Sequence, residues 1–146
     1  MTGVRLPPAT LLSVNVSLPK EITFRDKIVR TGIFKEPVDR RVEVTTLNIE
    51  GDGQADLIGH GGEQRAVLVY SFENYAYWEH ELGQSGFKFG HFGENFTVDG
   101  MLDEDIHVGD VFRIGTALFE VSQPRVPCYK LAIKVGVEGF YNQILK

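Results

Sequence analysis

Hydrophobic residues along this chain fall mainly into short runs that are rich in β-branched and aromatic side chains and are bounded by Gly, Pro, Asp or Asn. Such runs are typical of β-strands. They predict strands at Leu11 to Val16, Val42 to Leu47, Ala66 to Tyr70, Val111 to Ile114 and Ala117 to Val121. The pattern therefore favours a mainly β fold, as a barrel or a sandwich.

Turn and cap residues add one hairpin and two helices to these strands. Gly115-Thr116 separates the last two runs and predicts a tight hairpin. The stretch from Phe72 to Leu82 has helical spacing, with Ser71 before it as a cap and Gly83 after it as a stop. A second helix is predicted from Val137 to Leu145. We therefore expect a few helices to flank the strands.

Composition and charge narrow the class of protein. A chain of 146 residues with 42% hydrophobic and 24% charged residues suits one globular domain, residues 1–146. Its net charge of -5 argues against nucleic acid as a partner. A single cysteine excludes an intrachain disulfide, and the start of the chain lacks the pattern of a secretory signal. No apolar run approaches the roughly 20 residues that span a bilayer. We expect a cytoplasmic protein with no membrane partner.

That single cysteine, Cys128, lies in an unusual segment, Ser122 to Cys128, with two prolines and an arginine. Pro124 and Pro127 restrict the backbone, so the thiol is predicted to lie on a stiff loop and not inside a helix. Arg125 could hold an anion nearby and favour the thiolate, the form that attacks electrophiles and ligates soft metals. A small buried hydrophobic role for Cys128 remains the alternative.

Three glycine-bearing segments also carry candidate chemistry. Arg30 to Pro37 combines a hydroxyl with two cations, a composition that can hold a phosphate. Gly51 to Gly62 has closely spaced glycines that allow backbone N–H groups to approach a ligand. Phe89 to Thr97 contains Asn95, whose amide suits the edge of a heterocycle. Each segment taken alone could equally be a surface turn, and none matches a phosphate-binding or dinucleotide-binding fingerprint.

Other kinds of site are less well supported by the sequence. The four histidines show no paired spacing, so a zinc site is not indicated. Asp103 to Asp105 could in principle bind calcium, but it precedes a predicted turn and is interpreted as a solvated acidic edge. A nucleophilic pair of Cys128 with a histidine stays open, because the sequence does not say which histidine lies near it.

Five motifs together resemble one known family. They are Thr31-Gly32-Ile33-Phe34-Lys35, Gly51-Asp52-Gly53-Gln54-Ala55-Asp56, His60-Gly61-Gly62, Phe92-Gly93-Glu94-Asn95-Phe96 and Gln123-Pro124-Arg125-Val126-Pro127-Cys128. In this order the motifs resemble the MOSC family, named for the C-terminal domain of molybdenum cofactor sulfurase, and are most similar to its YiiM-like members. The resemblance extends from about Leu11 to Leu145.

The resemblance implies a MOSC-type β-barrel with a few flanking α-helices. It also implies the molybdenum cofactor, a pterin with a dithiolene and a terminal phosphate, and does not imply pyridoxal phosphate. Cys128 would be the catalytic residue, as the protein ligand to molybdenum or as a persulfide carrier. The other residues implied to contact the cofactor are Thr31, Gly32, Lys35, Asp56, His60, Gly61, Gly62, Asn95, Gln123 and Arg125.

The activity implied by the resemblance is reduction of N-hydroxylated compounds, such as N-hydroxylated purines, by oxygen-atom transfer at molybdenum. No flavin, iron–sulfur or nicotinamide signature is visible, so a separate reductase would supply the electrons. Asp56 and His60 could relay protons. The alternative functions are a non-catalytic carrier of cofactor or persulfide sulfur, and a cofactor-free interaction domain in which Cys128 is structural.

The length of the chain departs from the pattern of the YiiM-like members. These proteins usually continue beyond the helix that Gly139 to Leu145 resembles, whereas this chain ends at Lys146. A barrel without its closing strand would leave an open edge for a second copy to cover. We therefore keep a homodimer as a hypothesis.

Overall fold

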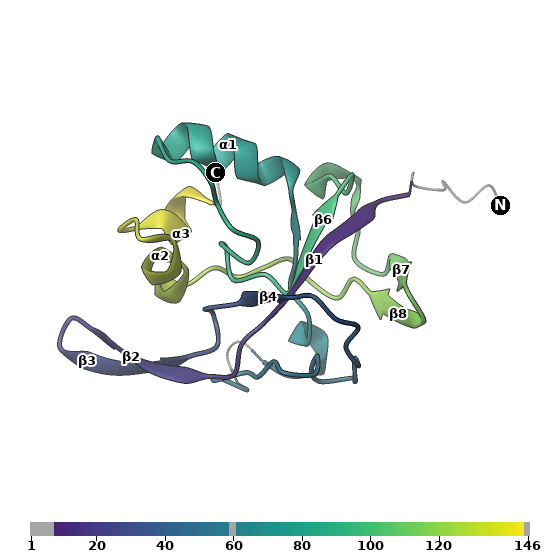
Figure 1. The fold of residues 1–146 in the computed structure, drawn as a ribbon, viewed down its shortest axis with the longest axis horizontal. Coiled ribbons are helices and arrows are strands. Elements are labelled where there is room, and N and C mark those ends of the chain that lie inside the picture. The colour runs from purple at the N-terminus through teal and green to yellow at the C-terminus, as the bar shows by residue number, and fades with distance from the viewer. Residues whose placement is uncertain (1–7, 59–60, 145–146) are drawn as a thin grey trace.

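A four-stranded sheet lies at the centre of the computed structural model, which describes residues 8–58 and 61–144 (Figure 1). Its strand order is β4-β1-β6-β5, with bounds Glu36–Val38, Thr10–Val16, Phe96–Asp99 and Val69–Ser71. β1 runs antiparallel to both neighbours, so that Val14 pairs with Val38 on one side and Phe96 on the other. β5 and β6 are parallel, which requires a crossover between them.

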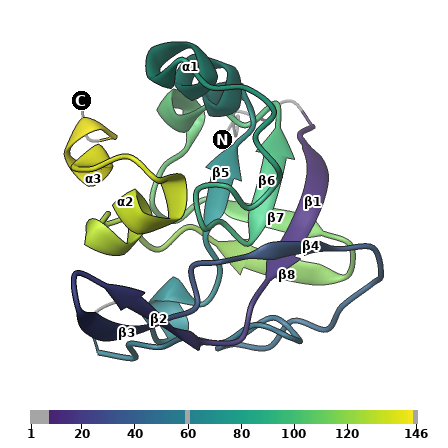
Figure 2. The same ribbon diagram turned by 60° about the vertical axis from the view of Figure 1, so that its left-hand side comes forward.

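Helix α1 (Glu73–Leu82) supplies this crossover and ends at Gly83, whose φ of 62° is favourable for glycine. Helix α2 (Tyr129–Val135) begins directly after Cys128, and α3 (Phe140–Gln143) follows it. Two short 3-10 helices, η1 (Glu63–Arg65) and η2 (Asp103–Asp105), lie in the connections. Figure 2 shows α2 beside the sheet, between α1 and the hairpin formed by β2 and β3.

Two hairpins complete the described strands. β2 (Lys20–Phe24) pairs with β3 (Lys27–Thr31), and the residues between them, Arg25 and Asp26, both have positive φ as tight hairpin turns require. β7 (Val111–Ile114) pairs with β8 (Ala117–Glu120). Figure 1 shows the two hairpins at opposite ends of the molecule.

Two apolar clusters hold these elements together. The larger one joins the helices to the loop before β6 and contains the buried residues Tyr75, Trp78, Phe92, Leu131, Val135 and Phe140. The smaller one joins the sheet to β8: Phe96 packs edge-on against Phe119, with ring centroids 5.3 Å apart, beside Ile49 and Val98. The central sheet is therefore packed on the helices through one cluster and on the β7–β8 hairpin through the other.

The fold class predicted from the sequence is confirmed as mainly β with a few helices. The finer expectation of a barrel is not met among the described residues, whose strands form one open sheet and two separate hairpins, not a closed barrel. The strands predicted at Leu11 to Val16, Val111 to Ile114 and Ala117 to Val121 are confirmed to within a few residues at their ends as β1, β7 and β8.

The strand predicted at Val42 to Leu47 is wrong. Only one isolated bridge joins Val44 to Ile49, because Thr45 and Asn48 form a turn between them. In this turn the Thr45 N–H donates to the Asn48 carbonyl, and the Asn48 N–H donates to Thr45 Oγ1. A side chain that bonds the local backbone in this way competes with strand pairing.

Two predicted helix features also differ. Ser71 is not the cap of α1: it is the last residue of β5, its hydroxyl donates to the Met101 carbonyl, and Phe72 takes the cap position. The predicted helix from Val137 to Leu145 is reduced to the single turn of α3 within the described residues. In the described part of the chain, no helix is both long and apolar enough to cross a membrane.

Candidate functional site

A groove with a volume of about 2400 Å³ lies along the open sheet and brings together most of the predicted site residues. Eight of them line it: Thr31, Gly32, Lys35, Asp56, Asn95, Gln123, Arg125 and Cys128. Gly61 and Gly62 are described but are not among the lining residues, and His60 lies outside the described residues. Segments separated by up to about a hundred positions in the sequence thus meet at one site.

Cys128 lies at the end of an irregular segment, as the proline pattern predicts. Residues 121–128 form neither helix nor strand, and Cys128 has extended backbone angles of -137° and 176° immediately before α2. Its thiol is free and half-buried. Cys128 is one of the acidic groups that act on Arg125 and raise its pKa, so the thiol and the guanidinium interact electrostatically. Thiol and guanidinium together form an anion-favouring end of the groove.

Arg125 is fixed in place by a backbone contact. Its Nη1 donates to the carbonyl oxygen of Phe92 at 2.6 Å, and Phe92 is fully buried. Burial lowers the pKa of Arg125, while Glu94, Tyr70 and Cys128 oppose this change as neighbouring acidic groups. The buried guanidinium still keeps its positive charge near neutral pH, because the ordinary pKa of arginine is very high. It therefore offers the groove a cation in a defined orientation.

A second cation of the groove, Lys35, is already paired. Its Nζ lies 2.5 Å from Asp52 Oδ1, with both side chains almost fully buried. Burial lowers the pKa of Lys35, and the charge and hydrogen bond of Asp52 counteract this. The backbone N–H of Ser17 also donates to Asp52 Oδ1, at 2.9 Å. Sequence reasoning missed Asp52 as an individual site residue, although it belongs to one of the recognised motifs.

Glycines allow the segments on either side of this pair to approach closely. A Cβ atom on Gly32 would lie 2.7 Å from the carbonyl oxygen of Gly53, so any larger residue at position 32 would force the two backbone segments apart. Two motifs that are distant in sequence thus touch through their backbones. This close approach brings Lys35 within reach of Asp52. It also explains why a glycine occupies position 32 of the Thr31–Lys35 segment.

Asn95 is directed toward the protein. Its Nδ2 donates to the Asn15 carbonyl at 3.2 Å and to Asp52 Oδ2 at 3.0 Å, and its Oδ1 accepts the N–H of Leu68 at 2.9 Å. Both amide hydrogens are thus used within the fold. The expected contact between Asn95 and a heterocycle remains a prediction, while its role as a cross-link between β1, the Asp52 loop and the residue before β5 is visible.

Glu94 is a further buried acid that sequence reasoning did not single out. Its side chain is 0% exposed, and the Tyr75 hydroxyl lies 2.9 Å from both carboxyl oxygens. Burial raises the pKa of Glu94 to about 7. Its position in the recognised Phe92–Phe96 motif was a signal for the segment but not for the role of this side chain.

The remaining predicted residues sit in local hydrogen-bond networks. Thr31 is buried, and its Oγ1 accepts the N–H of Ile33 at 3.2 Å. Gln123 Oε1 lies 3.5 Å from Arg65 Nη2. The N–H of Gly62 donates to Gln54 Oε1 at 2.8 Å. These contacts keep the lining segments in fixed positions relative to one another.

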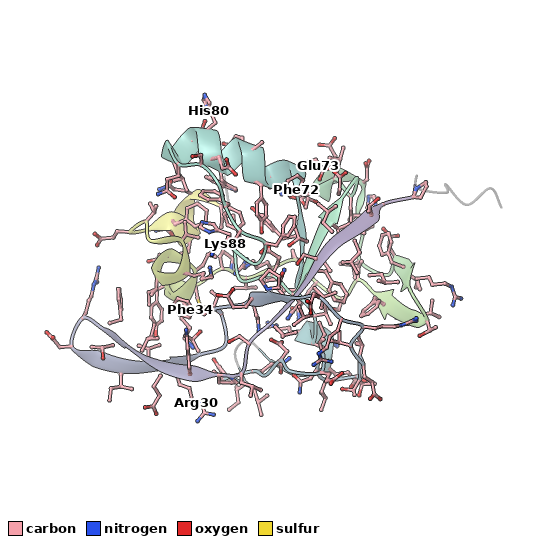
Figure 3. The ribbon with its side chains drawn as sticks, in the orientation of Figure 1. Arg30, Phe34, Phe72, Glu73, His80 and Lys88 are labelled. Atoms are coloured by element: carbon pink, nitrogen blue, oxygen red, sulfur yellow. The ribbon has the colours of Figure 1, made fainter. Side chains whose placement is uncertain are left out.

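The histidines do not form a recognisable catalytic pair with Cys128 among the described residues. His80 points away from α1 into solvent (Figure 3), and the ring of His91 stacks on Phe87 with a centroid distance of 3.9 Å. Burial lowers the pKa of His91 to about 4, so the ring is neutral near pH 7. His107 lines the groove without a hydrogen bond to Cys128, and His60 lies outside the described residues.

The donor set in the groove fits a metal group that brings most of its own ligands. No cluster of three or more His, Cys, Asp or Glu side chains able to hold a metal occurs in the described residues. The half-buried thiol of Cys128 offers one soft ligand, and Arg125 offers a charged fork suited to anionic oxygens. One thiol and one guanidinium in the groove are compatible with the molybdenum cofactor that the motif resemblance implies, a metal held in a dithiolene-bearing, phosphorylated pterin.

Comparison with known proteins gives the family. The MOSC domain family matches residues 56–146. YflK of Bacillus subtilis (strain 168) is 42% identical over 149 residues, covering 94% of this chain and 67% of YflK. The chain belongs to the MOSC domain family. This assignment confirms the resemblance found in the sequence motifs.

Two further relatives match this chain over part of their own length. Protein YiiM of Escherichia coli (strain K12) is 45% identical over 103 residues, covering 69% of this chain and 46% of YiiM. A protein named Reductase from Gibberella moniliformis (strain M3125 / FGSC 7600) is 32% identical over 154 residues, covering 95% of this chain and 27% of that protein. The MOSC domain described here thus spans about half or less of these two relatives.

A solved structure supports the fold of this MOSC domain. The crystal structure of YiiM from Geobacillus stearothermophilus superposes with a TM-score of 0.73 at 37% sequence identity, over 94% of this chain and 62% of that chain. The open sheet and its hairpins therefore match a recognised architecture, and the match spans 62% of the length of that YiiM chain.

Proposed function

We propose that residues 1–146, acting as a single MOSC domain, bind the molybdenum cofactor in the groove and reduce N-hydroxylated compounds there. The observation that carries this proposal is the placement of the single thiol, Cys128, beside Arg125 in a large groove. Membership of the MOSC family associates the domain with the molybdenum cofactor, and a relative named Reductase supports a reductive activity.

Each side chain has a distinct part in this proposal. Cys128 supplies the protein's thiolate ligand to molybdenum, since a soft thiolate suits this metal better than a carboxylate. Arg125 holds the anionic part of the cofactor through its planar fork. Thr31, Gly32, Asp56 and Gln123 line the same groove and shape the space for the pterin.

Lys35 and Asn95 take part mainly by holding the wall of the groove. Both contact Asp52, so they fix the Asp52 loop against β1 and β6. A cation that is already paired at 2.5 Å contributes little additional charge to a phosphate. We therefore assign the principal anion contact to Arg125 and a supporting role to Lys35.

The cofactor, when bound, would supply two-electron oxygen-atom transfer. The N–O bond of the substrate breaks, the amine is released, and two electrons with two protons convert the oxygen to water. The protein's contribution is to bind and orient the substrate, and to deliver protons to the groove. The electrons come from a separate donor protein, which we also propose as a partner.

The first test measures molybdenum by elemental mass spectrometry and pterin by fluorescence after oxidation. Wild type, Cys128→Ala and the surface control Ser85→Ala are purified from a host that makes the cofactor. We expect near-stoichiometric molybdenum and pterin in wild type and in the control, and loss of molybdenum from Cys128→Ala. Equal molybdenum in all three proteins would contradict ligation by Cys128.

The second test measures turnover of an N-hydroxylated purine by cofactor-loaded protein with a chemical reductant. Amine formation that depends on Cys128 supports the reductase. Bound cofactor without turnover under any reductant favours the alternative function, a carrier of cofactor or persulfide sulfur.

The homodimer stays a hypothesis that light scattering after size-exclusion chromatography tests. A monomer that persists on dilution would contradict the homodimer.

A further inference from the structure

The carboxyl group of Glu94 is buried without a direct ion pair among the described residues. Its side chain is 0% exposed, and among the ion pairs of the described residues none includes Glu94. An isolated carboxylate is costly to bury, and a carboxyl that must stay inside a protein tends to carry a proton or a function. The Tyr75 hydroxyl, 2.9 Å from each carboxyl oxygen, is its main side-chain partner.

Phe92 links Glu94 to Arg125, the cation of the groove. The N–H of Phe92 donates to Glu94 Oε1 at 3.3 Å, and the carbonyl oxygen of Phe92 accepts Arg125 Nη1 at 2.6 Å. Phe92 is itself fully buried and packs its ring against Tyr75, with centroids 5.1 Å apart. Both hydrogen bonds run to the backbone of this buried residue, so Phe92 joins the carboxyl and the guanidinium through one peptide segment.

Glu94 and Cys128 influence the same cation from two sides. Glu94 and Cys128 are both among the groups whose charge acts on Arg125. Arg125 and Cys128 line the groove, whereas Glu94 lies behind it and does not line it. A negative charge on Glu94 therefore offsets part of the positive potential that Arg125 produces at the Cys128 end of the groove.

We propose that Glu94 is a positioning residue of the Cys128 groove, which sets through Arg125 how much positive charge faces the Cys128 sulfur. The protonated carboxyl leaves the guanidinium charge to the groove. The ionised carboxyl offsets that charge from behind. This inference rests on the proposed function for its purpose, but the coupling of the three groups exists in the protein without any cofactor.

Several charged or titratable groups surround Glu94. Tyr75 contacts it from α1, Arg125 acts on it from the Cys128 loop, and Lys134 acts on it from α2. Tyr70 of β5 also interacts electrostatically with Glu94, and burial raises the pKa of that phenol, so that it stays neutral. Since burial raises the pKa of Glu94 to about 7, its charge changes near neutral pH while its neighbours keep theirs.

The test uses Cys128 as a reporter, because it is the only thiol of the chain. The full chain is purified without cofactor, and its alkylation rate with iodoacetamide is measured from pH 6 to pH 8.5 for wild type and Glu94→Gln. The amide keeps the size of the side chain and cannot ionise. We expect equal rates at pH 6 and an alkylation about fivefold faster in Glu94→Gln at pH 8, with the midpoint of the change near the pKa of Glu94.

A double-substitution cycle decides whether the effect passes through Arg125. In the Arg125→Gln background, Glu94→Gln should leave the alkylation rate unchanged at every pH. The control Glu79→Gln removes a negative charge from α1 outside this network and should match wild type. Tyr75→Phe is a second test that does not need the Arg125 variant to fold. It removes a hydrogen bond that favours the ionised carboxyl of Glu94, so the midpoint of the rate change should move to higher pH.

Three results would overturn the inference. They are an unchanged rate in Glu94→Gln, a rate change that is the same at pH 6 and pH 8, or an effect that persists without Arg125. Because the experiment uses cofactor-free protein, its outcome is separate from the molybdenum measurement. A protein that never binds molybdenum can still show the coupling, and a molybdenum-loaded reductase can lack it.

Discussion

Lys35 Nζ and Asp52 Oδ1 lie 2.5 Å apart and join two glycine-bearing motifs in a nearly solvent-free position. Asp52 also accepts the backbone N–H of Ser17 and the side-chain amide of Asn95. The carboxylate is therefore the centre of a network that fixes one wall of the groove. Groups in such a network are strongly interdependent, because removing one leaves the others buried without partners.

Asp52→Ala is expected to reduce the free energy of unfolding by about 3–5 kcal/mol, because it leaves the Lys35 ammonium buried without its counter-charge. Urea denaturation measures this change. The matched control is Glu50→Ala, which breaks the exposed pair with Arg40 and should lower the free energy of unfolding far less than Asp52→Ala. Similar losses in the two variants would contradict a structural role for the buried pair.

The sequence allowed the recognition of the motifs but not of the contacts between them. The strand at β1 and the end of α1 at Gly83 follow from local patterns, and both are confirmed. Asp52 and Glu94 acquire their roles from partners that lie elsewhere in the chain, Lys35 and Tyr75. No local pattern encodes such pairs.

The hairpin of β2 and β3 shows why part of the fold escaped prediction. Its strands carry many charged residues, and only one face is partly shielded, with Phe24 stacked on Tyr129 of α2 at 6.2 Å. The apolar content of this segment is too low to give a strong strand signal. The strand forms because a tight turn at Arg25-Asp26 and the contact with α2 stabilise it.

Asn95→Ala is expected to lower the free energy of unfolding of cofactor-free protein by about 2–4 kcal/mol, because two buried acceptors and the partly buried N–H of Leu68 lose a hydrogen-bond partner. Asn74→Ala, which removes a more exposed contact with Asp103, serves as control and should cost less than about 1 kcal/mol. Thermal unfolding followed by circular dichroism compares the two. A residue that acted only as a ligand contact would leave the stability of cofactor-free protein unchanged.

Gly93→Ala is expected to be more destabilising than Gly136→Ala. The two glycines have φ angles of 77° and 80°, so both substitutions carry a similar backbone penalty, about 1–2 kcal/mol. A Cβ on Gly93 would also lie 2.5 Å from Ile33 Cγ1, whereas a Cβ on Gly136 would meet no atom within 4 Å. The additional loss, about 1–3 kcal/mol, reports this clash. Equal unfolding free energies for both variants would show that the Gly93 site can relax.

Glu94→Gln is expected to change how stability depends on pH. The pKa of Glu94 is raised by burial from 4.5 to about 7, so between these values the folded state binds more protons than the unfolded state. The contribution of Glu94 to the free energy of unfolding is therefore fully present below pH 4.5 and is lost as the pH rises through about 7. The loss amounts to about 3 kcal/mol, since one unit of pKa corresponds to about 1.4 kcal/mol.

His91 changes stability in the opposite direction over an overlapping range. Burial lowers the pKa of His91 from 6.5 to about 4, so stability from this group is lost as pH falls through that window. In wild type the two effects largely cancel, and the total stability alone does not reveal Glu94. The difference in unfolding free energy between Glu94→Gln and wild type does, because His91 contributes equally to both proteins. We expect the variant to gain about 3 kcal/mol relative to wild type between pH 4.5 and pH 8, measured by urea denaturation. A difference that stays constant over this range would mean that Glu94 does not carry a proton in the folded protein near neutral pH.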